Sequence, residues 1–159
     1  MPEGSPLSEK ELFEKLCRYC AYRERAVSEV RTKLGSLTDD YTAIDHVVEA
    51  LKRERMVDDA RFARVYARSK HRHNHWGRVR IRIELGRRRV NDAHIEDALD
   101  ALDPADYLET LEGLVERNLR RWTGPDAFAR RGKALGFLRR KGYEADLVRD
   151  VLDQHLPLD

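Results

Sequence analysis

The sequence predicts an all-α fold, a tandem array of three three-helix, helix-turn-helix-like units that forms an elongated curved rod. Charged residues make up 38% of the chain and aromatic residues only 8%, which argues against one thick globular core. Five prolines and nine glycines leave little room for a turn-rich β architecture. The third observation is an internal repeat, which divides the chain into similar segments.

The repeat has an offset of 51 residues between its first two copies and needs no gap. It superposes Val30 on Ile81, Leu34 on Leu85, Gly35 on Gly86, Ile44 on Ile95, Val48 on Leu99 and Leu51 on Leu102. In a third copy, a further 53 residues along, the same positions are held by Ala134, Leu138, Val148 and Leu152. The first two positions are apolar in every copy and lie four residues apart, the spacing of one helix face.

The stretch RVRIRIEL, residues 78–85, alternates charged and apolar residues, a pattern typical of a half-buried β-strand. The alternation is local to this copy, because the positions of Val79 and Ile83 are polar in the first copy and glycine in the third. The four-residue spacing, in contrast, occurs in all three copies. We therefore predict a helix here, in which Val79 and Ile83 form a second apolar stripe beside the core stripe.

Capping residues predict where the helices begin and end. Ser8 with Glu11 has the spacing of a capping box, and Asp58 lies between the staple pair Val57 and Phe62. Further boundaries are predicted at Asn91-Asp92, at Asp103-Pro104, at Gly124-Pro125 and, as a C-terminal cap, at Gly142.

Each copy of the repeat thus contains three helices. The predicted units are residues 1–57, 58–103 and 104–159, with the first residues of the chain disordered. A unit of about 50 residues has a small core, so we expect neighbouring units to stabilise one another by packing.

The net charge of +2 hides a basic middle next to an acidic segment. Residues 61–90 contain eleven basic side chains and one acid, so ion pairing within this block cannot neutralise it. Ten of the eleven are arginine, which favours two-pronged contacts to phosphate or carboxylate. Residues 91–110 contain seven acids and no lysine or arginine. The basic block predicts a polyanionic or acidic partner, with nucleic acid first among the candidates.

The candidate binding residues are the basic face of the second unit and a smaller group in the third. They are Arg68, Lys70, Arg72, Arg78, Arg82, Arg87, Arg88, Arg89, Arg131, Arg139 and Arg140.

Catalytic motifs are weak. Gly132-Lys133 lacks the earlier glycine and the following Ser or Thr of a phosphate-binding loop. Cys17 and Cys20 have the spacing of a metal site but lack a second such pair, so core cysteines are the simpler interpretation. Asp58-Asp59 is explained by helix capping. We therefore expect no enzyme, no cofactor and no metal.

The chain has no apolar run of about 18 residues and no signal-peptide pattern at its start. Two cysteines suit a reducing compartment. These features predict a cytoplasmic protein without a membrane partner. No dimerisation segment is visible, so we expect a monomer.

Three segments resemble the RecX family of bacterial regulators of the RecA recombinase. They are VDDARFARVYA (57–67), WGRVRIRIEL (76–85) and LGFLRRKGYEADLVRDVL (135–152), and RAVSEVRTKL (25–34) matches in part. The resemblance implies tandem three-helix units without catalytic activity. It also implies a protein that lodges in the groove of the RecA–single-stranded DNA filament and restrains ATPase, strand exchange and co-protease functions in recombination, repair and the SOS response. At the turn after the central helix the family often has lysine–glycine, where this chain has Arg88-Arg89. The resemblance therefore implies the fold but not the geometry of that turn.

Other functions stay open at this point. A stand-alone helical protein that binds duplex DNA is the main alternative, and a metal enzyme at the Cys and His residues is a distant third. A filament regulator is expected to bind free single-stranded DNA only weakly. The acidic segment either keeps the third unit's basic face away from free DNA or meets a basic surface on the filament.

Overall fold

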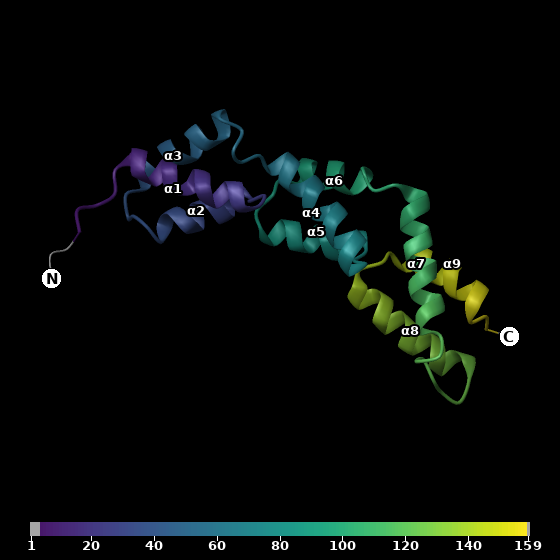
Figure 1. Cartoon of the computed structure of the whole chain (residues 1–159). Coiled ribbons are helices and arrows are strands. Elements are labelled where there is room, and N and C mark those ends of the chain that lie inside the picture. Colours follow the sequence, from purple (N-terminus) through teal and green to yellow (C-terminus); the bar gives the residue numbers. More distant parts are fainter. Residues whose placement is uncertain (1–3, 159) are drawn as a thin grey trace.

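The computed structural model describes residues 4–158, and this part of the chain is all-α, as predicted (Figure 1). The expected disorder at the start of the chain concerns residues that lie outside the described range. The helices are α1 (Glu9–Tyr22), α2 (Val27–Gly35), α3 (Tyr41–Arg53), α4 (Asp59–Asn74), α5 (Arg78–Arg87), α6 (Asp92–Asp100), α7 (Pro104–Asn118), α8 (Ala127–Lys141) and α9 (Ala145–His155). They follow one another along a bent rod, with the two ends of the chain far apart.

Two hydrophobic cores hold the helices together. The first lies among α1, α2 and α3, with Leu12, Leu16 and Leu51 fully buried. The second runs without a break through α4 to α9. Ala26, which precedes α2, belongs to the second core and so joins the two groups of helices. The boundaries at residues 57 and 103 remain a prediction, although the continuous second core agrees with the expectation that neighbouring units stabilise one another.

The repeat positions are the centre of both cores. The first position of the i, i+4 pair, at Val30, Ile81 and Ala134, is fully buried in all three copies. So is the second, at Leu34, Leu85 and Leu138. RVRIRIEL is confirmed as a helix, because it forms most of α5. The second apolar stripe stays in solvent, since 38% of Val79 and 51% of Ile83 are exposed.

Most predicted caps are confirmed. The side chains of Ser8, Asp58, Asn91 and Asp103 each accept a hydrogen bond from a backbone N–H three residues ahead. Gly142 ends α8 in the left-handed conformation, with φ of 94°. The predicted helix start at Gly124-Pro125 is wrong. Helix α8 begins at Ala127, because Asp126 takes the cap position and accepts from Ala129 N.

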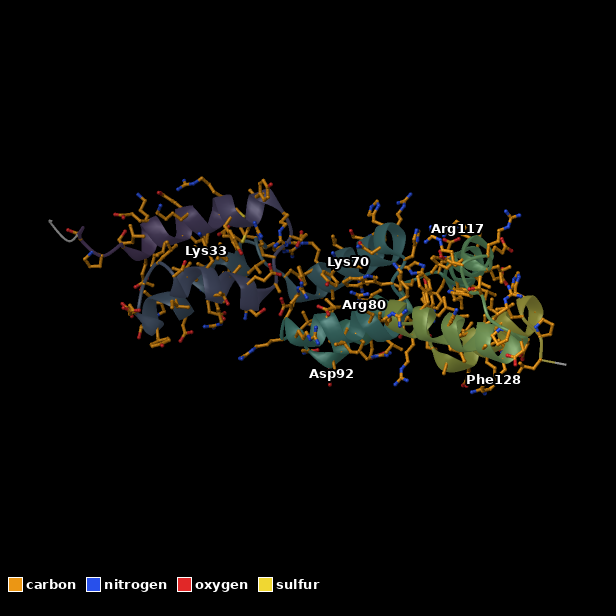
Figure 2. The ribbon with its side chains drawn as sticks, turned by 90° about the horizontal axis from the view of Figure 1, so that it is seen from below. Lys33, Lys70, Arg80, Asp92, Arg117 and Phe128 are labelled. Atoms are coloured by element: carbon orange, nitrogen blue, oxygen red, sulfur yellow. The ribbon has the colours of Figure 1, made fainter. Side chains whose placement is uncertain are left out.

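Helices α5 and α8 meet end to end (Figure 2). Gly77 N donates to Lys141 O at 2.7 Å, and Val79 N donates to Gly142 O at 2.9 Å. The first N–H groups of a helix lack partners within it, as do the last carbonyls. At this junction the end of α8 supplies the acceptors that the start of α5 needs.

The junction is so close that two glycines are required. A Cβ atom on Gly77 would collide with Gly142 O, and one on Gly142 would collide with Arg80 Cβ. The motif of an aromatic residue followed by glycine, Trp76-Gly77, therefore marks the contact between two helices and not a flexible turn.

A second contact joins the start of α2 to the end of α5 and to the start of α4. Ser28 Oγ donates to Arg88 O, and Val27 N donates to Asp59 Oδ1 at 2.8 Å. By the repeat, Ala26 corresponds to Gly77, and Arg89 corresponds to Gly142. Arg89 adopts φ of 57° without being glycine, which costs about 1–2 kcal/mol. Arg88-Arg89 thus form a left-handed turn that carries a side chain.

A polar cluster around Tyr107 fixes α7 against the α5–α8 junction. The Tyr107 hydroxyl donates to Glu144 Oε1 and accepts from Arg78 N at 3.0 Å. Arg78 pairs with Glu144 Oε2 at 2.8 Å and lies over the Tyr107 ring at 3.8 Å. Burial, together with the hydrogen bond to Glu144, raises the pKa of Tyr107 far above its ordinary value, so the phenol stays a donor at all physiological pH values.

We predict that Gly142→Ala lowers the free energy of unfolding by about 2–4 kcal/mol, because it adds both backbone strain and a collision with Arg80. Urea unfolding measures this. Gly86→Ala is the matched control: it lies on α5 with open space around its Cβ, and should raise stability by up to about 1 kcal/mol. Equal effects of the two substitutions would contradict the close junction.

Candidate partner-binding groove

Helix α4 carries a stripe of exposed arginines. Arg64, Arg68 and Arg72 are four residues apart and therefore lie on one face, about 6 Å from one to the next along the helix axis. Within the described part of the chain, none of the three forms an ion pair, so their charges remain available to a partner. We call these three residues the α4 arginine stripe.

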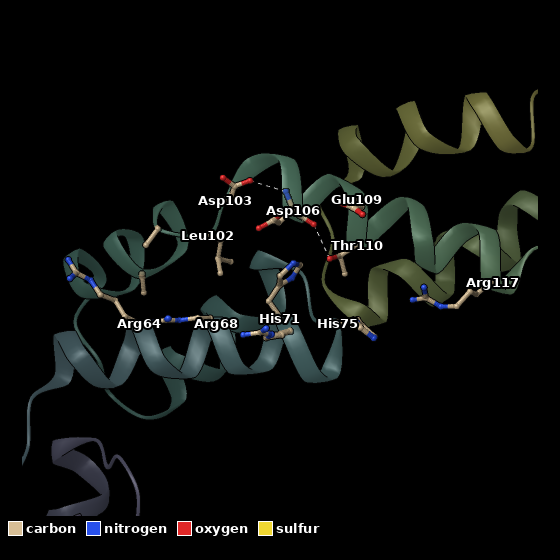
Figure 3. Close-up of a pocket in the computed structure, with 13 residues that line it drawn as sticks. Arg64, Arg68, His71, His75, Leu102, Asp103, Asp106, Glu109, Thr110 and Arg117 are labelled. Atoms are coloured by element: carbon tan, nitrogen blue, oxygen red, sulfur yellow. Dashed lines mark hydrogen bonds between the residues drawn. The ribbon is translucent and has the colours of Figure 1, made fainter.

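The stripe forms one wall of a groove of about 840 Å³ that lies between α4 and α7 (Figure 3). The opposite wall is acidic, with Asp103, Asp106 and Glu109 at the start of α7. Arg117, further along α7, adds a fourth guanidinium group to the lining. Asp103 accepts from Asp106 N as a helix cap, but among residues 4–158 the three carboxylates form no ion pair. We call this site the α4–α7 groove.

His71 and His75 complete the lining on the α4 side. His71 is only 8% exposed, and its ring stacks on that of Tyr107 with centroids 5.0 Å apart. Its Nδ1 donates to Trp76 O at 2.8 Å, while its buried Nε2 has no partner among the described residues. Burial lowers the pKa of His75, and the nearby positive charge of Arg117 adds to the effect. The fixed ring of His71 thus brings an unsatisfied nitrogen to the groove.

Arg78, Arg82 and Arg87 of α5 differ from the α4 arginine stripe, because they have carboxylate partners. Arg82 holds Glu96 of α6 with two hydrogen bonds of 2.8 and 3.2 Å, and these lower the pKa of the Glu96 carboxyl. Arg87 pairs with Glu84 at 2.9 Å, as Arg78 does with Glu144. The basic block is therefore partly neutralised by carboxylates that come from outside it.

The remaining candidates also divide into residues with contacts inside the protein and exposed residues without an ion pair. Arg88 contacts Glu84 at 3.3 Å and lies over the ring of Tyr66. Lys70 lies 5.2 Å from the ring of Trp76, also within reach of Tyr66. The candidates that are exposed and without an ion pair in the described chain are Arg68, Arg72, Arg89, Arg139 and Arg140.

Arg131 is the one candidate that the structure removes from the surface. It is 7% exposed, donates to Leu156 O at 2.9 Å and pairs with Asp153 at 3.0 Å. Its guanidinium group connects α8 to the end of α9, so a partner cannot reach it without opening that packing. We correct the prediction accordingly.

Arg64 and Arg117 line the groove and were not among the sequence candidates. For Arg64 a signal existed, because it precedes Arg68 and Arg72 at the same four-residue spacing. For Arg117 none existed, since only the packing of α7 against α4 brings it to this site.

No group of three His, Cys, Asp or Glu residues in the described range is placed to hold a metal ion. Cys17 and Cys20 are free thiols against the first core, and burial raises the pKa of both. Helices long and apolar enough to cross a membrane are absent from residues 4–158.

Comparisons with known proteins identify relatives of the chain. The description "RecX, second three-helix domain" matches residues 58–99, and "RecX, third three-helix domain" matches residues 105–152. The regulatory protein RecX of Halorhodospira halophila is 36% identical over 152 residues, which cover 94% of this chain and 90% of that protein. The regulatory protein RecX of Halalkalibacterium halodurans is 27% identical over 139 residues, 87% of this chain, but only 52% of its own length is covered.

A solved structure shares the fold. The crystal structure of RecX from Lactobacillus salivarius superposes with a TM-score of 0.84 at 23% sequence identity. The match covers 95% of this chain and 97% of that one. The array of helical units therefore occurs as a whole in both proteins.

We predict that paired and unpaired arginines differ in their effect on stability. Arg78→Gln should lower the free energy of unfolding by about 1–3 kcal/mol, because it leaves the half-buried Glu144 without its cation. Arg68→Gln should change it by less than about 0.5 kcal/mol, as for an exposed side chain without a partner. Urea unfolding of the two variants measures both. A similar loss in the two would mean that the α4 arginine stripe also has a structural role.

Proposed function

The chain belongs to the RecX family, and we propose that it regulates the RecA recombinase by binding the filament that RecA forms on single-stranded DNA. In this proposal it restrains the ATPase, strand exchange and co-protease activities of the filament by binding and not by catalysis. The observation that carries the proposal is the match of the family to both the second and the third domain.

The shape of the molecule supports this proposal. A bent rod of helical units offers a long surface that can contact several subunits of a helical filament at once. Contacts that are individually weak then act together, because the first one raises the effective concentration of the others. A rod that binds one conformation of the filament more tightly than others shifts the filament toward that conformation. Subunits that must change conformation during ATP hydrolysis or strand exchange are then slowed.

The distribution of charge supports an electrostatic part in binding. The α4 arginine stripe carries three cations that the described residues do not neutralise, in line on one exposed face. Exposed charges of this kind speed association and select partners more than they add affinity. We propose that the chain acts as a monomer in the cytoplasm and binds free single-stranded DNA weakly.

A stand-alone duplex-binding protein is the alternative. Such a protein should bind a specific duplex with a Kd of about 10⁻⁸ M or tighter at physiological salt. The acidic wall of the α4–α7 groove disfavours it, because Asp103, Asp106 and Glu109 would face the phosphates of any duplex laid against the α4 arginine stripe.

The proposal predicts inhibition of filament ATPase at less than one molecule per RecA subunit. RecA is assembled on single-stranded DNA with ATP, the protein is added, and phosphate release is followed. The variant Arg64→Gln/Arg68→Gln/Arg72→Gln should need about tenfold more protein for half-inhibition, since three exposed contacts contribute about 0.5 kcal/mol each.

The control is Arg120→Gln/Arg121→Gln/Arg149→Gln, which removes the same charge from exposed positions in the last 40 residues and should shift half-inhibition by less than about twofold. Wild-type protein that leaves the ATPase unchanged at stoichiometric amounts, while binding duplex DNA tightly, would favour the alternative.

A further inference from the structure

We propose that the α4–α7 groove is a docking site for a short polypeptide segment of the filament protein and not for nucleic acid. The segment would present acidic side chains to the α4 arginine stripe and basic side chains to the acidic wall. This inference rests on the proposed function, since it names which component of the filament the groove binds.

The two walls have opposite charge, and this is the first argument. Three guanidinium groups of α4 line one wall and three carboxylates line the other, with Arg117 further along α7, and no ion pair joins the walls in the described chain. At physiological salt, charges are screened over about 8 Å, so a strand lying in the groove would feel both walls. Phosphodiesters carry one sign only and would be repelled by Asp103, Asp106 and Glu109. A polypeptide can carry both signs.

His71 supplies the second, independent argument. Its Nδ1 bears the proton, because Trp76 O can only accept a hydrogen bond. Nε2 is buried without a partner among residues 4–158. A buried polar atom without a partner is costly, so a ligand group that forms a hydrogen bond with it should be favoured there. A polypeptide backbone offers either partner, an N–H donor or a C=O acceptor, whereas phosphodiester oxygens can only accept.

The length of the groove suits a short segment. From Arg64 to Arg72 the axis of α4 rises about 12 Å, which is the length of roughly four residues of extended chain. A segment of this length brings two side chains to each wall, because successive side chains of an extended strand point to opposite sides. Alternating acidic and basic residues would therefore match both walls at once.

The acidic wall has a second consequence. It lowers the affinity of the α4 arginine stripe for free DNA, while it adds contacts to the matching polypeptide. Specificity of this kind comes from repelling the wrong partner as well as attracting the right one. A regulator with such a groove would remain available for filaments instead of being held by exposed DNA.

The test is to neutralise the acidic wall without disturbing the cap at Asp103. Asp106→Asn/Glu109→Gln removes two charges whose side chains make no hydrogen bond in the described chain. Binding is measured twice, to preassembled RecA–single-stranded DNA filament and to the same DNA without RecA. The control Glu116→Gln/Asp150→Asn removes two exposed acidic charges from positions outside the groove. Thermal unfolding followed by circular dichroism verifies that all variants fold.

The proposal expects Asp106→Asn/Glu109→Gln to weaken filament binding about fivefold relative to the control, with binding to free DNA unchanged or tighter. Equal filament affinity of the two variants would overturn it. Tighter binding of Asp106→Asn/Glu109→Gln to both targets would also overturn it and assign the groove to nucleic acid. Wild-type protein that fails to bind the filament at all would contradict the proposed function itself and the inference with it.

Discussion

The end-to-end contact of α5 with α8 is the constraint on which the rest of the structure depends. Because the start of α5 takes its hydrogen-bond acceptors from the end of α8, the helices of one group cannot move without breaking backbone bonds to the next. The Tyr107 cluster adds α7 to the same joint through Arg78 and Glu144. The joint thereby sets how far α7 lies from α4, and so the width of the α4–α7 groove.

Charge in this protein has two separate uses. On α5, arginines bind carboxylates from α6, from the turn before α9 and from their own helix, and thus hold neighbouring elements together. On α4, the arginine stripe has no such partners in the described chain and faces a groove. The two helices look alike in composition, but the paired arginines of α5 lie at the joint or beside α6, whereas the α4 arginine stripe lines the groove.

Much of the fold could be predicted from the sequence, because burial in this chain repeats with the period of the units. Ile81 and Leu85 have buried counterparts in both other copies, and this repetition identified RVRIRIEL as a helix despite its strand-like alternation. Caps were equally readable, since a residue such as Asp58 acts on a neighbour three positions away. Interactions between residues that are close in the sequence can therefore be predicted from the sequence.

The site was harder to predict, because it depends on partners distant in sequence. Arg78 meets a carboxylate 66 residues away, and nothing near it in the sequence distinguishes it from Arg68, which meets none in the described chain. Arg131 shows the same difficulty, since its burial depends on the end of α9. Residue type and local density of charge therefore predicted a basic surface but not which of its members are free.

The central claim, that the α4 arginine stripe faces the filament, is tested most directly by footprinting the arginine side chains. Phenylglyoxal modifies accessible guanidinium groups, and mass spectrometry reports each site with and without preassembled RecA–single-stranded DNA filament. The account predicts that the filament protects Arg64, Arg68 and Arg72, while Arg120 and Arg121 react as before. Protection confined to Arg139 and Arg140, with α4 still reactive, would contradict it.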